Sequence, residues 1–156
     1  MTEKEINTLV ERVVENLSGS DNITLEVANA LIEKVKEKAK EIGVKAVVAV
    51  ANSAANPVAV QCMDDSFIAS YDIAFNKAYT VTALKMPTSK LRELAAPGGS
   101  LYGIQFTNQG KIVIFGGGVP LYNKEGTLVG GLGVSGGTES EDTFLAEYGG
   151  EIFRGM

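Results

Sequence analysis

The first constraint on chemistry in this chain is that it contains no histidine and only one cysteine, Cys62. Without imidazole, Ser-His-Asp and Cys-His nucleophile mechanisms are excluded, and so are zinc sites that need histidine. Catalysis would have to use carboxylates, lysine, tyrosine, Cys62 or a bound cofactor, and the sequence predicts no metal site. A lone cysteine is more often a small buried hydrophobe than a reactive thiol or ligand, so we expect Cys62 to be buried and inert.

Glycine is concentrated between residues 97 and 138, which hold 13 of the chain's 18 glycines. Short apolar runs separate them, as in strands joined by tight turns and unlike a flexible linker. Gly131–Gly136 spells G-x-G-x-x-G, but only 20 residues follow it. They leave no room for the further strand and acidic residue of a dinucleotide-binding unit. Gly116–Gly118 is followed by Val-Pro and therefore does not form a Walker A loop.

Two interpretations of the remaining glycines stay open. Gly98-Gly99 and Gly116–Gly118 can offer unhindered backbone N–H groups to an anionic ligand, as backbone nests do. They can equally form bulges at which strands bend, and the sequence alone favours this second interpretation. In both cases we expect this half of the chain to form a compact sheet whose loops frame a pocket.

The overall composition is that of one soluble globular domain. Hydrophobic residues make up 45% and charged residues 21% of the 156 positions, and the formal net charge is −5. This acidic balance, with no basic stripe, argues against nucleic acid as a partner. No apolar run approaches the roughly 20 residues of a membrane span, and the charged N-terminus lacks the apolar core of a signal peptide. We therefore expect a cytoplasmic protein.

Residues 2–17 predict an amphipathic helix, because their apolar positions recur every three or four residues. The stripe consists of Ile6, Leu9, Val10, Val13, Val14 and Leu17. A polar connector follows, which divides the chain into residues 1–22 and a domain at residues 23–156. The helix is interpreted either as docked on its own domain or at a subunit interface, or as a tag that lies in a partner's groove. As a tag, it resembles the encapsulation peptides that direct cargo enzymes into bacterial microcompartments.

The pattern of the domain predicts helices and short strands. Thr24 is a candidate N-cap for the first helix and Gly43 its C-terminal stop. The other expected elements are strands at 44–50 and 58–63, a helix at 66–85, a short helix capped by Thr88, strands at 103–107, 111–115, 119–122 and 128–134, and a last helix opened by a capping box at Thr138. Turns are expected at 53–57, 108–110 and 123–126. The helix at 66–85 is expected to turn inward Ile68, Tyr71, Ala74, Phe75, Ala78 and Val81.

Five motifs of the domain occur together in a defined order. They are Ser70-x-Asp72-Ile73-Ala74-x-x-Lys77-Ala78-Tyr79-Thr80, Pro87-Thr88, Ala96-Pro97-Gly98-Gly99-x-Leu101-Tyr102-Gly103, Phe115-Gly116-Gly117-Gly118-Val119-Pro120-Leu121 and Val129-Gly130-Gly131-Leu132-Gly133-Val134-Ser135-Gly136-Gly137-Thr138. From Ile23 to the C-terminus the chain thus resembles the GlcG/HbpS family, which includes the C-terminal domain of PduO-type proteins. The resemblance implies an α+β sandwich with a five-stranded, mostly antiparallel sheet flanked by helices. It also implies homo-oligomers, from dimers to octamers.

The resemblance further implies heme or related tetrapyrrole binding for some members, redox-sensing or accessory roles for others, and no agreed reaction. Heme iron is commonly held by His, Cys, Met or Tyr. In a chain without histidine, the candidate axial ligands are Tyr79, Tyr102, Met63, Met86 and Cys62. Asn52 is another departure, because the family usually has Asp at this position.

Two hypotheses for function follow. The first is a homo-oligomeric accessory protein that binds a small ligand such as heme or a corrinoid-related tetrapyrrole. We expect its site to be lined by Lys77, Tyr79, Gly98, Gly99, Tyr102, Gly116, Gly117 and Gly118. Lys77 would pair with a carboxylate such as a heme propionate. The second is an enzyme acting on a small oxygenated metabolite of diol or glycolate metabolism, with Lys77, Asp72 or Tyr79 transferring the proton. In either case, residues 2–17 as a tag would bind a shell protein and place the chain in the compartment lumen.

Overall fold

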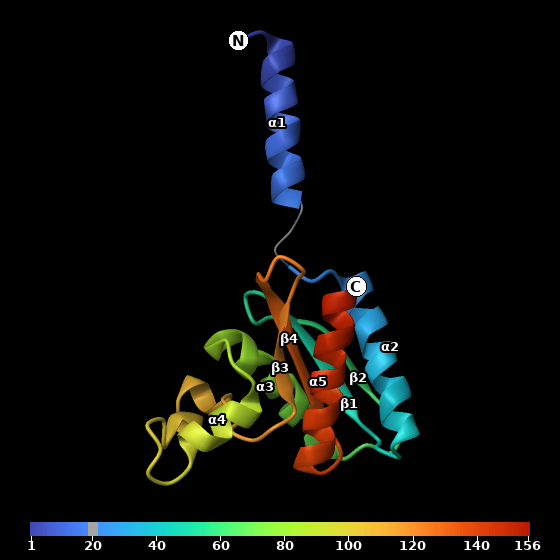
Figure 1. Ribbon diagram of the computed structural model, residues 1–156, viewed down its shortest axis with the longest axis vertical. Helices are drawn as coiled ribbons and strands as arrows, with labels where there is room; N and C mark the ends of the chain where they lie inside the picture. The colour runs from blue at the N-terminus through green and yellow to red at the C-terminus, as the bar shows by residue number, and fades with distance from the viewer. Residues whose placement is uncertain (19–21) are drawn as a thin grey trace.

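The computed structural model describes residues 1–18 and 22–156, with side chains for residues 1–11 and 22–156. The elements in chain order are α1 (Glu3–Ser18), α2 (Leu25–Glu41), β1 (Val47–Asn52), β2 (Pro57–Cys62), α3 (Ile68–Leu84), α4 (Thr88–Ala95), the short 3-10 turns η1 (Ile104–Phe106) and η2 (Asn108–Gly110), β3 (Gly118–Tyr122), β4 (Leu128–Ser135) and α5 (Glu139–Gly155). Figure 1 shows α2 and α5 side by side on one face of the sheet, with α3 and α4 on the other.

The four strands form one antiparallel sheet in the order β2-β1-β4-β3. This confirms the expected α+β fold with an antiparallel sheet flanked by helices. The described residues contain four strands, however, and the expected fifth is absent from them. Strands expected at 119–122 and 128–134 correspond to β3 and β4, whereas the segments 103–107 and 111–115 are not strands.

Each of the two missing strands has a physical cause, one local and one from a distant residue. Gly103 has a φ of +91° and turns the chain into η1, which ends the extended run before it can pair. The backbone at 111–115 is held instead by a side chain of α3. The N–H of Val113 donates to Oγ1 of Thr80 at 3.0 Å, and this hydroxyl lies 3.2 Å from the carbonyl oxygen of Lys111. With no strand on either side of residues 108–110, they form η2 and not a hairpin turn.

The two faces of β1 explain how the sheet holds its helices. Val48 and Val50 belong to the core beneath α2 and α5, whereas Val47, Ala49 and Ala51 face α3. All five side chains are almost completely buried. The alanines on the second face are small, so α3 can approach the sheet closely.

Two glycines of β4, the strand beside β1, also allow α3 to approach the sheet closely. A Cβ atom at Gly131 would lie 2.6 Å from the carbonyl oxygen of Ala78, and one at Gly133 would overlap the carbonyl oxygen of Ala74. Only glycine therefore allows the backbone of α3 to lie on β4 at this distance. The G-x-G-x-x-G string is explained by helix-on-sheet packing and needs no nucleotide.

Local sequence signals for helix starts and one turn are confirmed. The hydroxyl of Thr24 accepts a hydrogen bond from the N–H of Val27 at 3.3 Å and caps α2. Thr138 and Glu141 form the expected capping box of α5. The turn at 123–126 joins β3 to β4 as a hairpin. Each of these signals satisfies backbone groups within four residues of itself.

Two residues of the β1–β2 hairpin were singled out by the sequence. The Asn52 side-chain oxygen accepts hydrogen bonds from the N–H groups of Ala54, at 3.0 Å, and Asn56, at 3.1 Å. It thereby closes the turn, a role that an aspartate oxygen can also fill. Cys62 ends β2 and is exposed, so the expectation that it is buried is wrong. The cause is topological, because β2 is an edge strand with no neighbour on its outer side.

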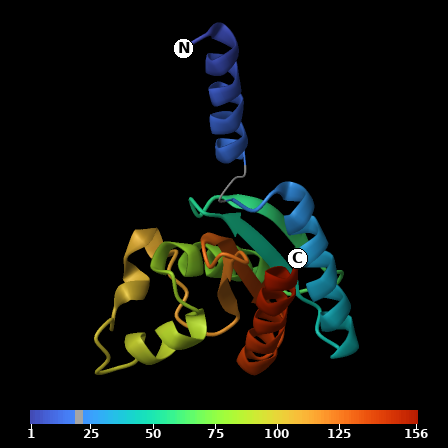
Figure 2. The same ribbon diagram turned by 45° about the horizontal axis from the view of Figure 1, so that its top comes forward.

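The helix predicted for residues 2–17 is α1, which extends away from the domain in both views (Figures 1 and 2). Its apolar residues Ile6, Leu9 and Val10 are exposed. Val13, Val14 and Leu17, which continue the stripe in the sequence, lie outside the described side chains. Among the described residues, no helix is both long and apolar enough to span a membrane.

Candidate functional site

Lys77 lies in the middle of α3 and has none of its surface exposed to solvent. Its ammonium donates hydrogen bonds to the carbonyl oxygen of Val134, at 2.7 Å, and to Oδ2 of Asp142, at 3.3 Å. The same nitrogen lies 5.1 Å from the centre of the Phe115 ring. The expected site residue is therefore the centre of an internal ion pair joining α3, the end of β4 and the start of α5.

Asp142 completes this pair from the first turn of α5. Its Oδ1 accepts a hydrogen bond from the N–H of Gly137 at 2.8 Å, while Oδ2 faces Lys77. Burial lowers the pKa of Lys77 and raises the pKa of Asp142, and the opposite charge of the partner counteracts each shift. The sequence places Asp142 in the first turn of a helix, where a carboxylate is common, and nothing in a single sequence indicates that two distant charges meet inside the domain.

The Gly116–Gly118 turn lies directly over this ion pair and is itself buried. The N–H of Gly116 donates to Oε1 of Glu139 at 3.0 Å, and the N–H of Gly118 donates to Oγ1 of Thr88 at 2.9 Å. Both N–H groups thus have acceptors within the chain. The second contact also corrects the predicted role of Thr88, which is the first residue of α4 and not its cap.

Gly117 is required by its backbone conformation and by its neighbours. Its φ is +116°, and a Cβ atom there would lie 2.5 Å from Nζ of Lys77 and 2.7 Å from the carbonyl oxygen of Val134. A side chain at this position would displace the ion pair. The triplet is thus a tight turn that leads into β3.

The other expected site residues lie at the surface, on α3 and the loop that follows α4. The Tyr79 hydroxyl donates to Oδ1 of Asn108 at 2.9 Å, and the Lys111 ammonium lies 5.2 Å from the Tyr79 ring centre. Tyr102 is 67% exposed and Phe106 is 83% exposed. Gly98 is exposed and Gly99 half-buried in the same loop.

The expected site residues therefore fall into two groups. Tyr79, Tyr102, Gly98 and Gly99 belong to one surface, which we call the loop surface: residues 97–111 together with Tyr79. Lys77 and Gly116–Gly118 belong to the interior. Sequence reasoning missed Phe106 and Lys111 because their run was assigned to strands, where alternate residues would have been buried.

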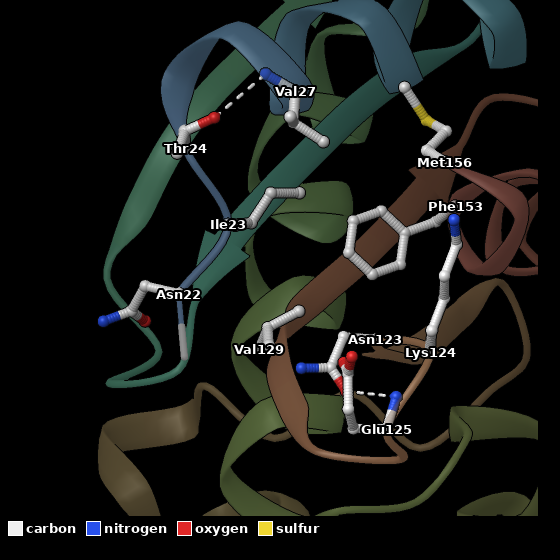
Figure 3. Close-up of a pocket in the computed structure, with 10 residues that line it drawn as sticks. All are labelled: Asn22, Ile23, Thr24, Val27, Asn123, Lys124, Glu125, Val129, Phe153 and Met156. Carbon is white, nitrogen blue, oxygen red and sulfur yellow. Dashed lines mark hydrogen bonds between the residues drawn. The ribbon is translucent and has the colours of Figure 1, made fainter. Parts of the chain in front are cut away.

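A first pocket, of about 290 Å³, lies where the domain begins (Figure 3). Ile23 and Val27 from the N-terminal side, Val129 from β4 and Phe153 from α5 provide apolar walls, and Lys124 and Glu125 stand on the β3–β4 turn. This volume is at the low end of the range for small-molecule sites. None of the five candidate iron ligands lines it.

A cleft of about 690 Å³ separates α4 from the start of α5. Nη1 of Arg92 pairs with Oε1 of Glu139 across it at 3.1 Å, and Glu93 and Glu147 add two further carboxylates. The cleft has no tyrosine, cysteine or methionine among its lining residues. Its donor set does not fit heme, because there is no iron ligand and the carboxylates would repel propionates.

A third pocket, of about 410 Å³, is lined by Cys62 and Met63 with Lys36, Lys40 and Lys45. The two sulfur atoms of this pocket differ in whether they already have a hydrogen-bond partner. The sulfur of Met63 accepts a hydrogen bond from the N–H of Ala46 at 3.3 Å and is thus turned toward the backbone. No cluster of three or more His, Cys, Asp or Glu side chains suited to a metal ion occurs within the described part of the chain.

The residues proposed for proton transfer are also placed by the structure. Lys77 has no exposed surface, so a substrate in solution has no contact with its ammonium. Asp72 is exposed on α3, where its Oδ1 accepts a hydrogen bond from the Asn76 amide at 3.1 Å. Tyr79 is engaged with Asn108, as described above. These three side chains do not converge on one pocket among those described.

Comparison with known proteins places these features in a family. The family model "Haem degrading protein HbpS-like" matches residues 23–151. A 15.0 kDa protein of Citrobacter freundii, uncharacterized and encoded in the dhaT-dhaS intergenic region, is 46% identical over 80% of this chain and 87% of its own length. The corrinoid adenosyltransferase PduO of Salmonella typhimurium is 37% identical over 71% of this chain, but the match spans only 33% of that longer protein.

Two solved structures share the fold over nearly their whole length. Protein ORFY of Klebsiella pneumoniae has a TM-score of 0.82 and 41% identity, covering 86% of this chain and 92% of that one. A structure described as a PduOC:heme complex has a TM-score of 0.79 and 32% identity, covering 83% of this chain and 94% of that one. With its antiparallel four-stranded sheet and the matched residues 23–151, this chain belongs to the HbpS-like family.

Proposed function

We propose that this protein binds a tetrapyrrole, such as heme, on its loop surface and acts as a homo-oligomeric accessory protein. The observation that carries the ligand class is the fold shared with the PduOC:heme complex at 32% identity. The location rests on this chain's own residues. Tyr102 and Phe106 present flat apolar groups to solvent, as a planar macrocycle requires.

The donor set of the loop surface fits heme better than that of the first pocket and of the cleft between α4 and α5, because neither of these has a candidate iron ligand. Tyrosine is an established iron ligand, and Tyr79 and Tyr102 are the two tyrosines of this surface. Lys111 supplies an exposed ammonium beside Tyr79 for a propionate. It replaces Lys77 in this role, because Lys77 is committed to Asp142 inside the domain. Bound heme would supply the iron chemistry, while the chain holds and orients it.

Hemin titration followed by the Soret band tests this proposal. We expect saturable binding at micromolar protein, weakened about tenfold, or ~1.4 kcal/mol, when Tyr102→Ala removes the exposed ring. Tyr102→Phe separates the two roles of this residue. It retains the flat contact and changes the spectrum only if the phenol oxygen is an iron ligand. Tyr148→Phe, on α5 beside Lys38, is the matched control. A wild-type protein with no saturable Soret shift would contradict the proposal.

We also propose that α1 is a targeting tag for a microcompartment shell. The proposal is supported by the exposed side chains of Ile6, Leu9 and Val10, which form an apolar stripe with no cover among the described residues. Such a stripe can lie in the groove of a partner. Deleting residues 1–20 should abolish co-purification with shells and leave the melting temperature of the domain unchanged. In the full chain, Leu9→Glu should weaken co-purification with shells, whereas Thr8→Ser should leave it unchanged.

Retention of the truncated protein in purified shells would refute the tag. It would leave the tetrapyrrole proposal untouched, because α1 contributes no residue to the loop surface. The two parts of the proposed function are therefore tested separately.

A further inference from the structure

The pocket of Figure 3 forms where three distant parts of the chain meet, and none of its residues belongs to the loop surface. The N–H of Ile23 donates to the carbonyl oxygen of Val129 at 3.1 Å, which fixes the start of the domain against β4. Figure 3 shows the Phe153 ring turned toward both side chains. All three residues belong to the larger apolar core, so the walls of this pocket are preformed.

A hydrogen-bond donor stands on the β3–β4 turn, at one side of these walls. Oδ1 of Asn123 accepts hydrogen bonds from the N–H groups of Glu125, at 3.1 Å, and Thr127, at 2.9 Å. Because both partners are donors, the amide oxygen must face them and the amide nitrogen must face away. Figure 3 shows this nitrogen on the side of Val129. It has no acceptor among the described residues, so the amide offers its N–H groups to the pocket.

Lys124 adds a positive charge at the same turn. Its side chain is exposed, and Figure 3 shows it extending from the turn toward Phe153. The ion pairs of the described residues all join other side chains. The ammonium of Lys124 is therefore available to an anion at the mouth of the pocket.

We infer that this pocket binds a small carboxylic acid with an apolar chain. The chain lies against Ile23, Val129 and Phe153, while the carboxylate accepts hydrogen bonds from the Asn123 amide and pairs with Lys124. Apolar walls with a few convergent polar groups are the usual composition of a small-molecule site. A volume of about 290 Å³ holds about ten water-sized groups at ~30 Å³ each, so the ligand has at most about nine non-hydrogen atoms.

Three probes with the same six-carbon chain test the ligand class: hexanoate, hexan-1-ol and hexylammonium. Each is titrated into the isotope-labelled full chain while the amide NMR signals of Ile23, Val129 and Phe153 are followed. We expect hexanoate to give saturable shifts of all three signals. Hexan-1-ol should bind about threefold more weakly, because it keeps the apolar contact and loses the partly exposed ion pair. Hexylammonium should bind more weakly still, because it brings a like charge to Lys124.

Variants of the two charged lining residues test the head group independently. Lys124→Gln should weaken hexanoate binding about threefold, whereas Glu125→Gln, which removes the one carboxylate side chain that lines the pocket, should tighten it by about the same factor. Neither variant should change the affinity for hexan-1-ol. The matched control is Lys90→Gln, at an exposed position of α4 on the opposite face of the sheet, and it should leave hexanoate binding unchanged.

Hexanoate that fails to saturate, shifts only signals outside the pocket, or binds no better than hexylammonium would overturn the inference. Tighter hexanoate binding by the full-length Leu9→Glu variant would also overturn it, because the apolar stripe of α1 would then be the occupant of the pocket. The hemin titration is a separate test, since the pocket shares no residue with the loop surface.

Discussion

At the scale of single residues, Lys77 is completely buried, and the contacts of its side-chain nitrogen determine what this part of the domain can do. Its ammonium is shared between Asp142 and the carbonyl oxygen of Val134 beneath the Gly117 turn. The sequence singles out Lys77 as a candidate ligand-site residue, and the structure places it in the interior of the domain. Burial of a lysine cannot be predicted when its partner lies 65 residues away in the chain.

The first prediction concerns the stability of this pair. Lys77→Met leaves Asp142 buried without a counter-charge, so the free energy of unfolding should fall by about 3–5 kcal/mol. The double variant Lys77→Met/Asp142→Leu removes both charges and should lose less than Lys77→Met alone. Urea unfolding followed by circular dichroism measures both. Lys34→Met, in the exposed Lys34–Glu37 pair, is the control and should change little.

If Lys77→Met were as harmless as Lys34→Met, the ammonium would contribute nothing to holding the Gly116–Gly118 turn. The turn would then have to be maintained by the hydrogen bonds from Gly116 to Glu139 and from Gly118 to Thr88. The ion pair would in that case be a consequence of the fold and not one of its supports.

The second prediction concerns pH. Burial lowers the pKa of Lys77 in the folded state below its ordinary value of 10.5. At a pH between the lowered pKa of the folded state and the ordinary pKa of 10.5 in the unfolded chain, the unfolded chain binds a proton that the folded chain lacks. Raising the pH therefore favours folding. The stability of the wild type relative to Lys77→Met should therefore increase as the pH rises toward 10.5. Urea unfolding at pH 7 to 10 tests the sign, and a falling difference would contradict it.

At the scale of elements, the contact between α3 and β4 determines the architecture. Gly131 and Gly133 have no side chains at the two points where the backbone of α3 contacts β4, next to Ala78 and Ala74. The same two residues explain why a nucleotide-like string occurs in a domain without a nucleotide-binding unit. Glycine is used here for close approach of two backbones.

The third prediction tests this contact. Gly133→Ala places a methyl group against the backbone of α3, so it should lower the free energy of unfolding by about 1–3 kcal/mol or prevent folding. Gly155→Ala is the control, because a Cβ there meets nothing within 4 Å and its φ is not in the left-handed region. Thermal unfolding compares the two. Equal melting temperatures would show that α3 does not need this approach.

Elements with local signals were predictable from the sequence, and elements held by distant groups were not. Thr24, the capping box at Thr138 and the 123–126 turn satisfy their own backbone neighbours, so their signals are complete in the sequence. The run at 111–115 has strand composition, but its hydrogen-bond partner is the Thr80 hydroxyl on α3. Composition indicates that a segment is extended and does not reveal what it pairs with.

At the scale of the whole molecule, the two layers of helices differ in how much apolar surface they expose to solvent. α2 and α5 close one face of the sheet around the larger apolar core, whereas α3 covers the other face and exposes an apolar stripe of its own. The loop surface lies beside the far end of that stripe, at Tyr79. The sequence predicts that Ile68 and Tyr71 face inward, whereas both are exposed on the outer side of α3. The helix is apolar on both sides, so periodicity alone could not distinguish them.

The most direct test of the proposed ligand site is a crystal structure of the protein grown with hemin, with the iron located by its anomalous scattering. We expect an iron position beside the loop surface, within bonding distance of the phenol oxygen of Tyr79 or Tyr102, and the macrocycle against Phe106. Iron in the Cys62 pocket, in the pocket of Figure 3, or nowhere on a protein that had been titrated to saturation would contradict the account.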